Sequence, residues 1–281
     1  MITKEKVLPF IKTALEEDIR EGDHSSLACI PKDKIDKAQL LIKESGIIAG
    51  IQLAEWIFEY VDPSIEINKL IQDGDTVKKG SIAFTVSGPS ISILTAERLV
   101  LNCMQRMSAI ATKTNEYVKL VSGTETTILD TRKTTPGIRI LEKWAVKIGG
   151  GANHRFGLYD MIMLKDNHID FAGGIPQAIK KVKKYLEDNN LNLQIEVEAR
   201  DMNEVKEIKS IGGIHRIMLD NFTPEETIAA VKYINGEFET ESSGGITDKT
   251  LRTYAECGVD FVSVGALTHS INNMDLSLKA Y

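Results

Sequence analysis

After Gly123 the sequence alternates six times between a short apolar run and a helix-like segment, and this repetition limits the fold more than any other feature. Strands that alternate with helices in this way must run parallel, because each helix returns the chain to the same edge of the sheet. The expected strands are residues 127–129, 161–164, 194–197, 216–219, 237–241 and 260–264. The helices expected between them are residues 138–148, 175–188, 202–210, 224–234 and 248–257. The spacing favours an α/β barrel or an open doubly wound sheet, and no GxGxxG motif supports a dinucleotide-binding fold.

Each expected strand ends in, or is followed by, charged, polar or glycine residues. In a parallel barrel the carboxyl ends of all strands open at one mouth, where α/β proteins build their sites. The six endings are residues 130–133, 165–168, 196–198, 220–221, 241–245 and 264–266. Six polar endings in succession predict a ring of functional groups at one barrel mouth.

Basic residues concentrate in the first two of these endings and the segment between them. Residues 129–170 contain seven lysines and arginines against five carboxylates, whereas the whole chain has a net charge of −6. Arginine binds a carboxylate or phosphate through two parallel hydrogen bonds, and lysine acts as a point charge. We therefore predict a pocket for a small, strongly anionic substrate.

The last two strand endings are suited to a phosphate group. Ser243-Gly244-Gly245 precedes the expected helix 248–257, and Gly265-Ala266 follows the sixth strand. Glycine lets backbone N–H groups approach an anion, and phosphate sites in such barrels often lie between the last two loops. If strands five and six pair, these residues form a phosphate site; two ordinary turns are the alternative.

The third and fourth endings supply carboxylates. Glu196 and Glu198 share one face of their strand because side chains alternate with period two. Acids that point into a barrel are unfavourable unless they bind something. Glu198 and Asp220 suit ribose hydroxyls or hydrated Mg²⁺, and a salt bridge to Lys165 is the structural alternative. His154 lacks a third ligand at a spacing typical of a metal site.

The first 120 residues follow a different pattern. Helices are expected at residues 3–19, 51–61 and 90–120, with strand-like alternation over 37–50 and 64–89. The acids of EEDIREGD, after the first helix, fit a solvated helix end better than a metal site. The hydrophobic content of 42% is enough for a full core.

Composition also limits the compartment and the partners. No signal peptide and no run near the ~20 apolar residues of a membrane span are visible. The odd number and wide separation of Cys29, Cys103 and Cys257 predict buried free thiols in a cytoplasmic protein. A pI near 5.5 argues against general binding to nucleic acid.

The chain resembles the nicotinate-nucleotide pyrophosphorylase (carboxylating) family, also called quinolinate phosphoribosyltransferase. The resemblance rests on TAERLVLN, SAIAT, DTRKTTPG, GGGANHRFGL, LKDNH, IEVE, LDN, ESSGG and GVDFVSVGALTHS, which occur in the family's order over residues 95–270. It implies an α/β protein with an N-terminal α/β sandwich domain, residues 1–106, joined by the tail 270–281. An incomplete, open parallel α/β barrel of about six strands, residues 107–269, would follow.

The resemblance also assigns site residues by position. It implies Lys133, Glu198 and Asp220 as catalytic residues, with Glu198 and Asp220 holding the ribose and Mg²⁺. The residues implied to bind the acidic groups of the substrates are Arg98, Thr131, Arg132, Lys133, His154, Arg155 and Lys165. Those implied to hold the 5-phosphate are Ser243, Gly244, Gly245, Val264, Gly265 and Ala266. Arg98 would reach the site of the partner subunit.

The reaction implied is phosphoribosyl transfer from phosphoribosyl pyrophosphate to quinolinate with decarboxylation, a step of NAD biosynthesis. The resemblance further implies a Mg²⁺-dependent cytoplasmic glycosyltransferase, a homodimer or a hexamer, with neither nucleic acid nor membrane as partner. Three alternatives stay open: a phosphoribosyltransferase for another pyridine carboxylate, a sugar-phosphate lyase or isomerase, and a non-catalytic binder of phosphorylated metabolites. In the lyase, Lys165 would form the Schiff base.

Overall fold

Antiparallel and parallel strands separate into different parts of the chain in the computed structural model, which describes residues 2–281. The chain forms two compact units, which we call unit 1 and unit 2. Unit 1 comprises the residues up to Asn115, Thr134–Gly150 and Ala266–Tyr281, and unit 2 comprises Glu116–Lys133 and Gly151–Gly265. The domain ranges expected from the sequence, 1–106 with 270–281 and 107–269, stay a prediction.

Unit 1 is built on an antiparallel sheet. Its strand order is β12-β1-β5-β3, where the bounds are Leu276–Ala280, Ile35–Ile42, Ile82–Pro89 and Glu66–Lys69. A second, two-stranded sheet pairs β2 (Gly46–Ile47) with β4 (Thr76–Val77). Alternate residues of β1 are buried, which follows from the period-two alternation of a strand with one face on the core.

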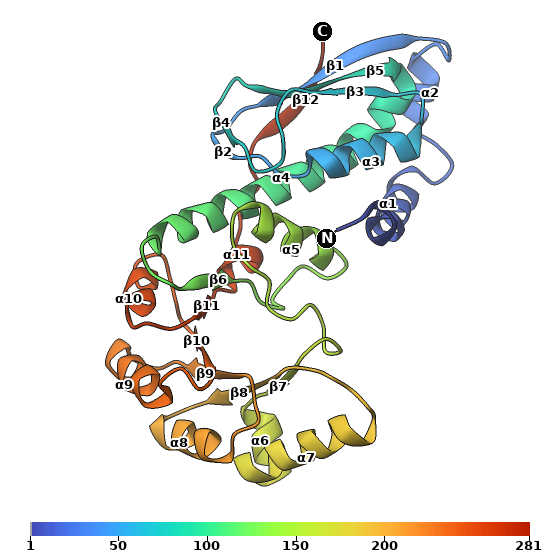
Figure 1. The fold of residues 1–281 in the computed structure, drawn as a ribbon. Helices are drawn as coiled ribbons and strands as arrows, with labels where there is room; N and C mark the ends of the chain where they lie inside the picture. The colour runs from blue at the N-terminus through green and yellow to red at the C-terminus, as the bar shows by residue number, and fades with distance from the viewer. Residues whose placement is uncertain (1) are drawn as a thin grey trace. The chain divides into compact units, whose positions relative to one another are not determined.

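Helices make up the rest of the regular structure of unit 1. They are α1 (Lys4–Ile19), α2 (His24–Cys29), α3 (Ile51–Val61), α5 (Arg139–Ile148), α11 (Ala266–His269) and α4 (Ser90–Leu120), which continues into unit 2. Figure 1 shows α3 and α4 running beneath the sheet. Phe58 of α3 meets Phe84 of β5 edge to face at 6.2 Å, and Trp56 stacks on Trp144 of α5 at 5.6 Å. These aromatic contacts tie α3 to both the sheet and α5.

Unit 2 contains a parallel sheet of six strands in the order β6-β11-β10-β9-β8-β7. The strands are β6 (Thr127–Leu129), β7 (Ile162–Leu164), β8 (Ile195–Ala199), β9 (Arg216–Asp220), β10 (Glu239–Ser243) and β11 (Phe261–Ser263). The strands β6 and β7 form the two edges of the sheet and do not pair with each other, so the sheet is not closed. This confirms the expected open α/β barrel, including the pairing of its fifth and sixth strands.

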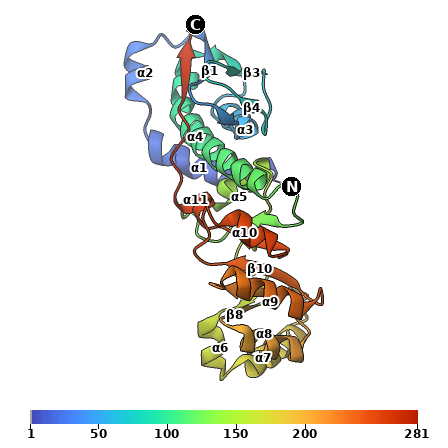
Figure 2. The ribbon, with the colours of Figure 1, turned by 90° about the vertical axis from the view of Figure 1, so that its left-hand side faces the viewer.

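The helices of unit 2 lie on the outside of the sheet (Figure 2). They are α6 (Asp166–Ala172), α7 (Ile175–Asp188), α8 (Met202–Ile211), α9 (Pro224–Ile234) and α10 (Leu251–Glu256). The start of α9 is fixed locally, because the Thr223 hydroxyl accepts from the Glu226 N–H while the Glu226 carboxylate accepts from the Thr223 N–H.

Three expectations differ from the structure. The side chain of Cys29 is exposed at the end of α2, whereas Cys103 and Cys257 are buried, so only two of the three thiols are inside. The helix expected from residue 248 begins at Leu251, because residues 247–250 form a turn first. The short helices α2, α6 and α11 were not expected. Among residues 2–281, no helix combines the length and apolarity that a membrane crossing needs.

Candidate active site

The parallel pairing in unit 2 gathers the six polar strand endings at one edge of the sheet. Arg132 and Lys133 follow β6, Lys165 follows β7, and Asp220 ends β9. Lys133 is exposed, and its backbone N–H donates to the Thr131 hydroxyl at 3.0 Å, which fixes the turn that carries the lysine. Thr131 therefore acts on the shape of the turn in this structure.

Lys165 is positioned by two neighbours. Its backbone N–H donates to Nδ1 of His168 at 3.0 Å, which closes the first turn of α6. Its Nζ lies 3.0 Å from Oε2 of Glu198, which is buried in β8. The salt bridge considered as a structural alternative is therefore present. Because Lys165 is half-exposed beside this carboxylate, its charge also faces the edge of the sheet.

Glu198 and Asp220 form a pair of carboxylates on the neighbouring strands β8 and β9. Burial and then the charge of Glu198 raise the pKa of Asp220 above its ordinary value. Two carboxylates that repel one another at the end of a sheet provide hard oxygen ligands, which are the ligands Mg²⁺ prefers. The residues present thus fit the implied metal ion.

The glycines after β10 adopt a conformation that needs glycine. Gly244 has φ +94°, and a Cβ there would lie 2.2 Å from Oδ1 of Asn221. Gly245 has φ +61° and open space around its Cα. The turn therefore presents bare backbone beside Asp220, although no helix follows it directly. After β11, Val264 is buried and its N–H donates to the Leu129 carbonyl, so Gly265 is the more accessible residue of that ending.

The segment that carries His154 and Arg155 is fastened to β6. Ala152 forms a parallel bridge with Leu129, and the buried Asp130 carboxylate accepts the His154 N–H at 2.9 Å. The Arg155 guanidinium donates to the Met161 carbonyl at 3.2 Å. Burial and then the nearby Arg132 guanidinium lower the pKa of Arg155.

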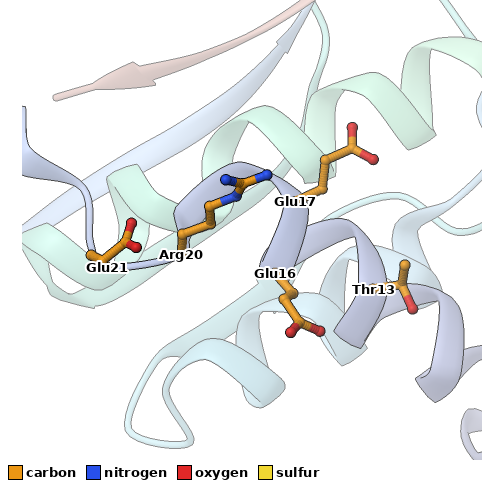
Figure 3. A pocket seen from close by; sticks show the side chains of 5 residues that line it. All are labelled: Thr13, Glu16, Glu17, Arg20 and Glu21. Atoms are coloured by element: carbon orange, nitrogen blue, oxygen red, sulfur yellow. The ribbon is translucent and has the colours of Figure 1, made fainter.

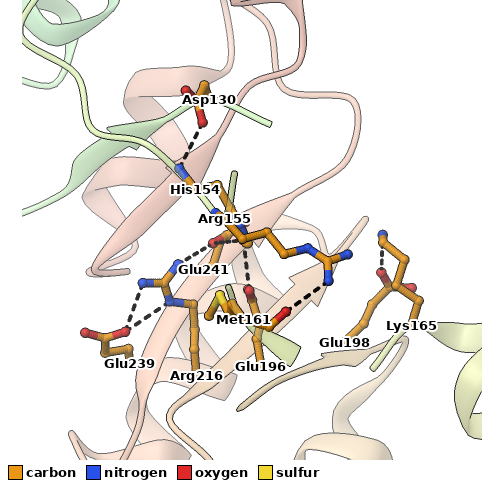
Figure 4. Close-up of polar contacts among 10 residues, drawn as sticks. All are labelled: Asp130, His154, Arg155, Met161, Lys165, Glu196, Glu198, Arg216, Glu239 and Glu241. Carbon is orange, nitrogen blue, oxygen red and sulfur yellow. Dashed lines mark hydrogen bonds and ion pairs between the residues drawn. The ribbon is translucent and has the colours of Figure 1, made fainter. Parts of the chain in front are cut away.

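A group of buried charged side chains lies behind this segment in unit 2, and sequence reasoning missed its arrangement. Nε2 of His154 lies 2.8 Å from Glu196 Oε2 and 3.5 Å from Glu241 Oε2 (Figure 4). Nη1 of Arg216 lies 2.9 Å from Glu241 Oε2, and its guanidinium stacks over the Phe261 ring at 3.9 Å. The face shared by Glu196 and Glu198 was the only signal, because the sequence does not show which strands are neighbours.

Two site residues expected from the sequence belong to unit 1. Arg98 is exposed on α4, and Ala266 is the first residue of α11. A further pair in unit 1 went unnoticed in the sequence: Arg106 Nη2 lies 2.8 Å from Oε1 of the buried Glu142. Glu142 Oε2 accepts the Thr135 N–H at 3.0 Å, so this pair holds the segment that follows Lys133 in the chain.

The acids after the first helix line an open hollow in unit 1 (Figure 3). Its volume is about 670 Å³, and its walls are the exposed side chains of Thr13, Glu16, Glu17, Arg20 and Glu21. Arg20 has a positive φ of 43° where α1 ends. The hollow therefore lies in the segment for which a solvated helix end was expected.

Comparison with known proteins identifies the family. Residues 23–108 match the model of the quinolinate phosphoribosyl transferase N-terminal domain, and residues 110–279 match that of the C-terminal domain. The chain belongs to the quinolinate phosphoribosyltransferase family. The resemblance seen in the sequence is thereby confirmed.

Individual relatives agree over nearly the whole chain. A chloroplastic nicotinate-nucleotide pyrophosphorylase (carboxylating) of Arabidopsis thaliana is 49% identical over 96% of this chain and 81% of its own length. A probable nicotinate-nucleotide pyrophosphorylase (carboxylating) of Bacillus subtilis is 39% identical over 93% of this chain and 89% of its own. The crystal structure of NadC from Streptococcus pyogenes matches with a TM-score of 0.93 and 35% identity, covering 100% of this chain and 99% of that one.

Proposed function

We propose that this chain transfers the phosphoribosyl group of phosphoribosyl pyrophosphate to quinolinate, giving nicotinate mononucleotide, pyrophosphate and CO₂ in NAD biosynthesis. The observation that carries the proposal is the set of cations at the carboxyl edge of the sheet, beside the carboxylate pair of Glu198 and Asp220, in a member of this family. Both substrates are polyanions, so the positive charge of these side chains is complementary to the negative charge of the substrates.

The cations bind and orient the two substrates. Arg132 and Arg155 suit the planar carboxylates of quinolinate, and Lys133 and Lys165 suit phosphate oxygens. His154 lies behind Arg155, and Thr131 holds the turn of Lys133. Ser243, Gly244 and Gly245, with Val264, Gly265 and Ala266, line the 5-phosphate. Holding both polyanions in attack geometry replaces a bimolecular encounter with an effectively unimolecular one.

The chemistry is a displacement followed by decarboxylation. The pyridine nitrogen attacks the anomeric carbon while the bond from that carbon to pyrophosphate breaks. Glu198 and Asp220 stabilise the positive charge that develops on the ribose, and Lys133 stabilises the negative charge on the leaving group. The bond between C2 and its carboxylate then breaks and CO₂ leaves, the electron pair stays on C2 beside the quaternised nitrogen that stabilises it, and C2 takes up a proton with that pair. The residues act by position and charge, with no covalent enzyme intermediate.

Glu198 and Asp220 would also hold Mg²⁺ through their carboxylate oxygens. The ion, when bound, adds positive charge against the pyrophosphate. We further propose a homodimer, with the hexamer as a larger assembly, in which Arg98 of each subunit completes the site of the other. The exposure of Arg98 supports this role. Three free cysteines suit the cytoplasm, where thiols stay reduced.

The lyase alternative is weakened by one contact. A Schiff-base lysine must direct its amine at the substrate carbonyl, but Nζ of Lys165 is paired with the Glu198 carboxylate at 3.0 Å. A phosphoribosyltransferase for nicotinate would share every other element of the proposal. The choice of pyridine substrate therefore distinguishes the two enzymes.

The experiment measures nicotinate mononucleotide and pyrophosphate formed from phosphoribosyl pyrophosphate with quinolinate or with nicotinate, each with and without Mg²⁺. We expect metal-dependent product from quinolinate alone. Product from nicotinate alone would overturn the substrate, and stabilisation by ligands without product would favour a binding protein.

A further inference from the structure

A buried network of charged side chains includes His154 and lies directly behind Arg155 in unit 2 (Figure 4). His154, Glu196 and Glu241 are at most 7% exposed, and Arg216 is 8% exposed. These residues come from β8, β9, β10 and the segment before β7, so four separate parts of the chain converge. Burying so many charges is unfavourable unless their geometry serves a purpose, and none of them except His154 has a role in the reaction described above.

One hydrogen bond to the His154 ring and two close carboxylates define its tautomer. The Arg155 backbone N–H lies 2.6 Å from Nδ1 of His154 and can only donate, so Nδ1 is the acceptor. The proton of the neutral imidazole is therefore on Nε2. That nitrogen faces Glu196 Oε2 at 2.8 Å and Glu241 Oε2 at 3.5 Å. The carboxylate beside Nε2 thus keeps the proton on that nitrogen, so that Nδ1 can accept a hydrogen bond. A second partner of a histidine commonly selects the tautomer in this way.

The network restricts where Arg155 can point. The backbone N–H of His154 donates to Asp130 and its ring faces Glu196, so both ends of the residue are fixed. The ring in turn accepts the N–H of Arg155, which fixes the backbone from which the guanidinium extends toward the Met161 carbonyl. Glu196 has no direct path to the substrate edge, since it is completely buried.

We propose that Glu196, supported by Glu241, is a positioning residue for Arg155, acting through the Nε2–H tautomer of His154. This inference rests on the proposed function, in which Arg155 binds a substrate carboxylate. His154 then contributes through its orientation of Arg155, because both of its ring nitrogens face protein groups.

The same three side chains form a set that could ligate a metal ion, but their surroundings favour a network of ion pairs. Nη1 of Arg216 lies 2.9 Å from the Glu241 oxygen that a metal would need, and a guanidinium is always charged. A metal on Nε2 of His154 would also have to displace the proton that faces Glu196.

Kinetics of three variants test the proposal. Glu196→Met removes the acceptor at similar length, Glu196→Gln keeps an acceptor oxygen, and Glu239→Gln removes a partner of Arg216 that does not contact His154. We expect Glu196→Met to raise KM for quinolinate by about tenfold or more, the effect of a lost hydrogen bond at a charged group. KM for phosphoribosyl pyrophosphate should stay within about twofold, since its binding groups are untouched. Glu196→Gln should restore most of the quinolinate affinity, and Glu239→Gln should behave like the wild type.

The tautomer is tested without substrate, by ¹⁵N NMR of the five histidines, with the His154 signals assigned by their loss in His154→Asn. Nδ1 should resonate as an unprotonated nitrogen and Nε2 as a protonated one in the wild type and in Glu196→Gln. A proton on Nδ1, or a wild-type KM for quinolinate in folded Glu196→Met, would overturn the proposal. If Glu196→Met does not fold, the wild-type spectrum still decides the network. A wild type inactive on quinolinate but with the expected spectrum would instead overturn the proposed function.

Discussion

Lys133 is the cation whose removal should affect the reaction most and the fold least, because its side chain is exposed at the end of β6. We predict that Lys133→Ala lowers turnover by roughly 10²–10³-fold, the usual effect of losing one charge that stabilises a leaving group. Unfolding temperature should stay unchanged. Lys184→Ala, at an exposed position on α7, is the matched control and should keep full activity. Near-normal turnover in Lys133→Ala would remove this lysine from the mechanism.

Glu196 should make stability depend on pH in a defined direction. Burial raises its pKa from 4.5 to about 7, against the opposing charges of Arg216, Arg155 and Lys165 and beside Glu241 and His154. When the folded chain raises the pKa of a carboxyl, that group stabilises the folded state fully at pH values below its unfolded pKa. This contribution is lost as the pH rises through the folded pKa.

The comparison of wild type with Glu196→Gln isolates this contribution. The wild-type advantage in unfolding free energy should shrink by on the order of 3 kcal/mol between about pH 4.5 and about pH 7. Urea unfolding of both proteins across this range measures it. Curves that stay parallel would mean that Glu196 titrates near its ordinary pKa.

At the scale of single residues, the sequence predicted which groups stand at the strand ends but not how they pair. Lys133, Lys165 and Asp220 follow apolar runs, and this local signal is enough to place them at one edge of a parallel sheet. His154 contacts both Glu196 of β8 and Glu241 of β10, and this depends on the order of strands in space, in which β9 alone separates β10 from β8. Single-sequence periodicity carries no information about that order.

The turn after β10 is the element in which backbone shape should control phosphate binding. A Cβ on Gly244 would collide with Asn221, whose own φ is +57° and whose side chain donates to Asp220 at 2.7 Å. We predict that Gly244→Ala raises KM for phosphoribosyl pyrophosphate by about tenfold or more, because the turn and the Asp220 carboxylate must both shift.

The matched control for this turn is Gly80→Ala, which has a similar φ of +93° and nothing within 4 Å of the added Cβ. It shares the conformational strain but lies in unit 1, before α4. Both variants should lose some stability, and steady-state kinetics should separate them. Equal KM values would show that Gly244 serves the fold alone.

Whole elements were predictable where the sequence marks both ends. The bounds of α7 and α9 agree with the expected ranges 175–188 and 224–234, since proline begins each helix and amphipathic spacing continues to its end. The helices α2, α6 and α11 were missed because four to seven residues give too few turns for a periodic signal. Their stability comes from caps and neighbours, which only the folded chain supplies.

At the scale of the whole molecule, the proposed exchange of Arg98 between subunits makes a prediction that one chain alone cannot meet. Arg98→Ala and Lys133→Ala should each be nearly inactive. Mixed and allowed to exchange subunits, they should recover about a quarter of wild-type activity, because half of randomly formed dimers are mixed and each of those has one intact site.

The outcome separates the two possible origins of Arg98 in the site. If Arg98 serves the site of its own subunit, every mixed dimer retains two defective sites and no activity returns. Mixing Arg98→Ala with Arg98→Lys is the negative control, since neither chain supplies an arginine at this position. Native mass spectrometry after mixing, with one of the two variants carrying a mass tag, checks that mixed dimers have formed.

Each of the two main sheets pairs an early strand with one of the last strands of the chain. β1 pairs with β12, and β6 pairs with β11. On a ribosome, β1 and β6 emerge long before these partners, so each carries an unpaired edge during most of translation, and such edges attract other chains. Neither sheet is complete until its later partner strand, β12 or β11, has left the exit tunnel. Yield in cells should therefore depend on chaperones that cover these edges.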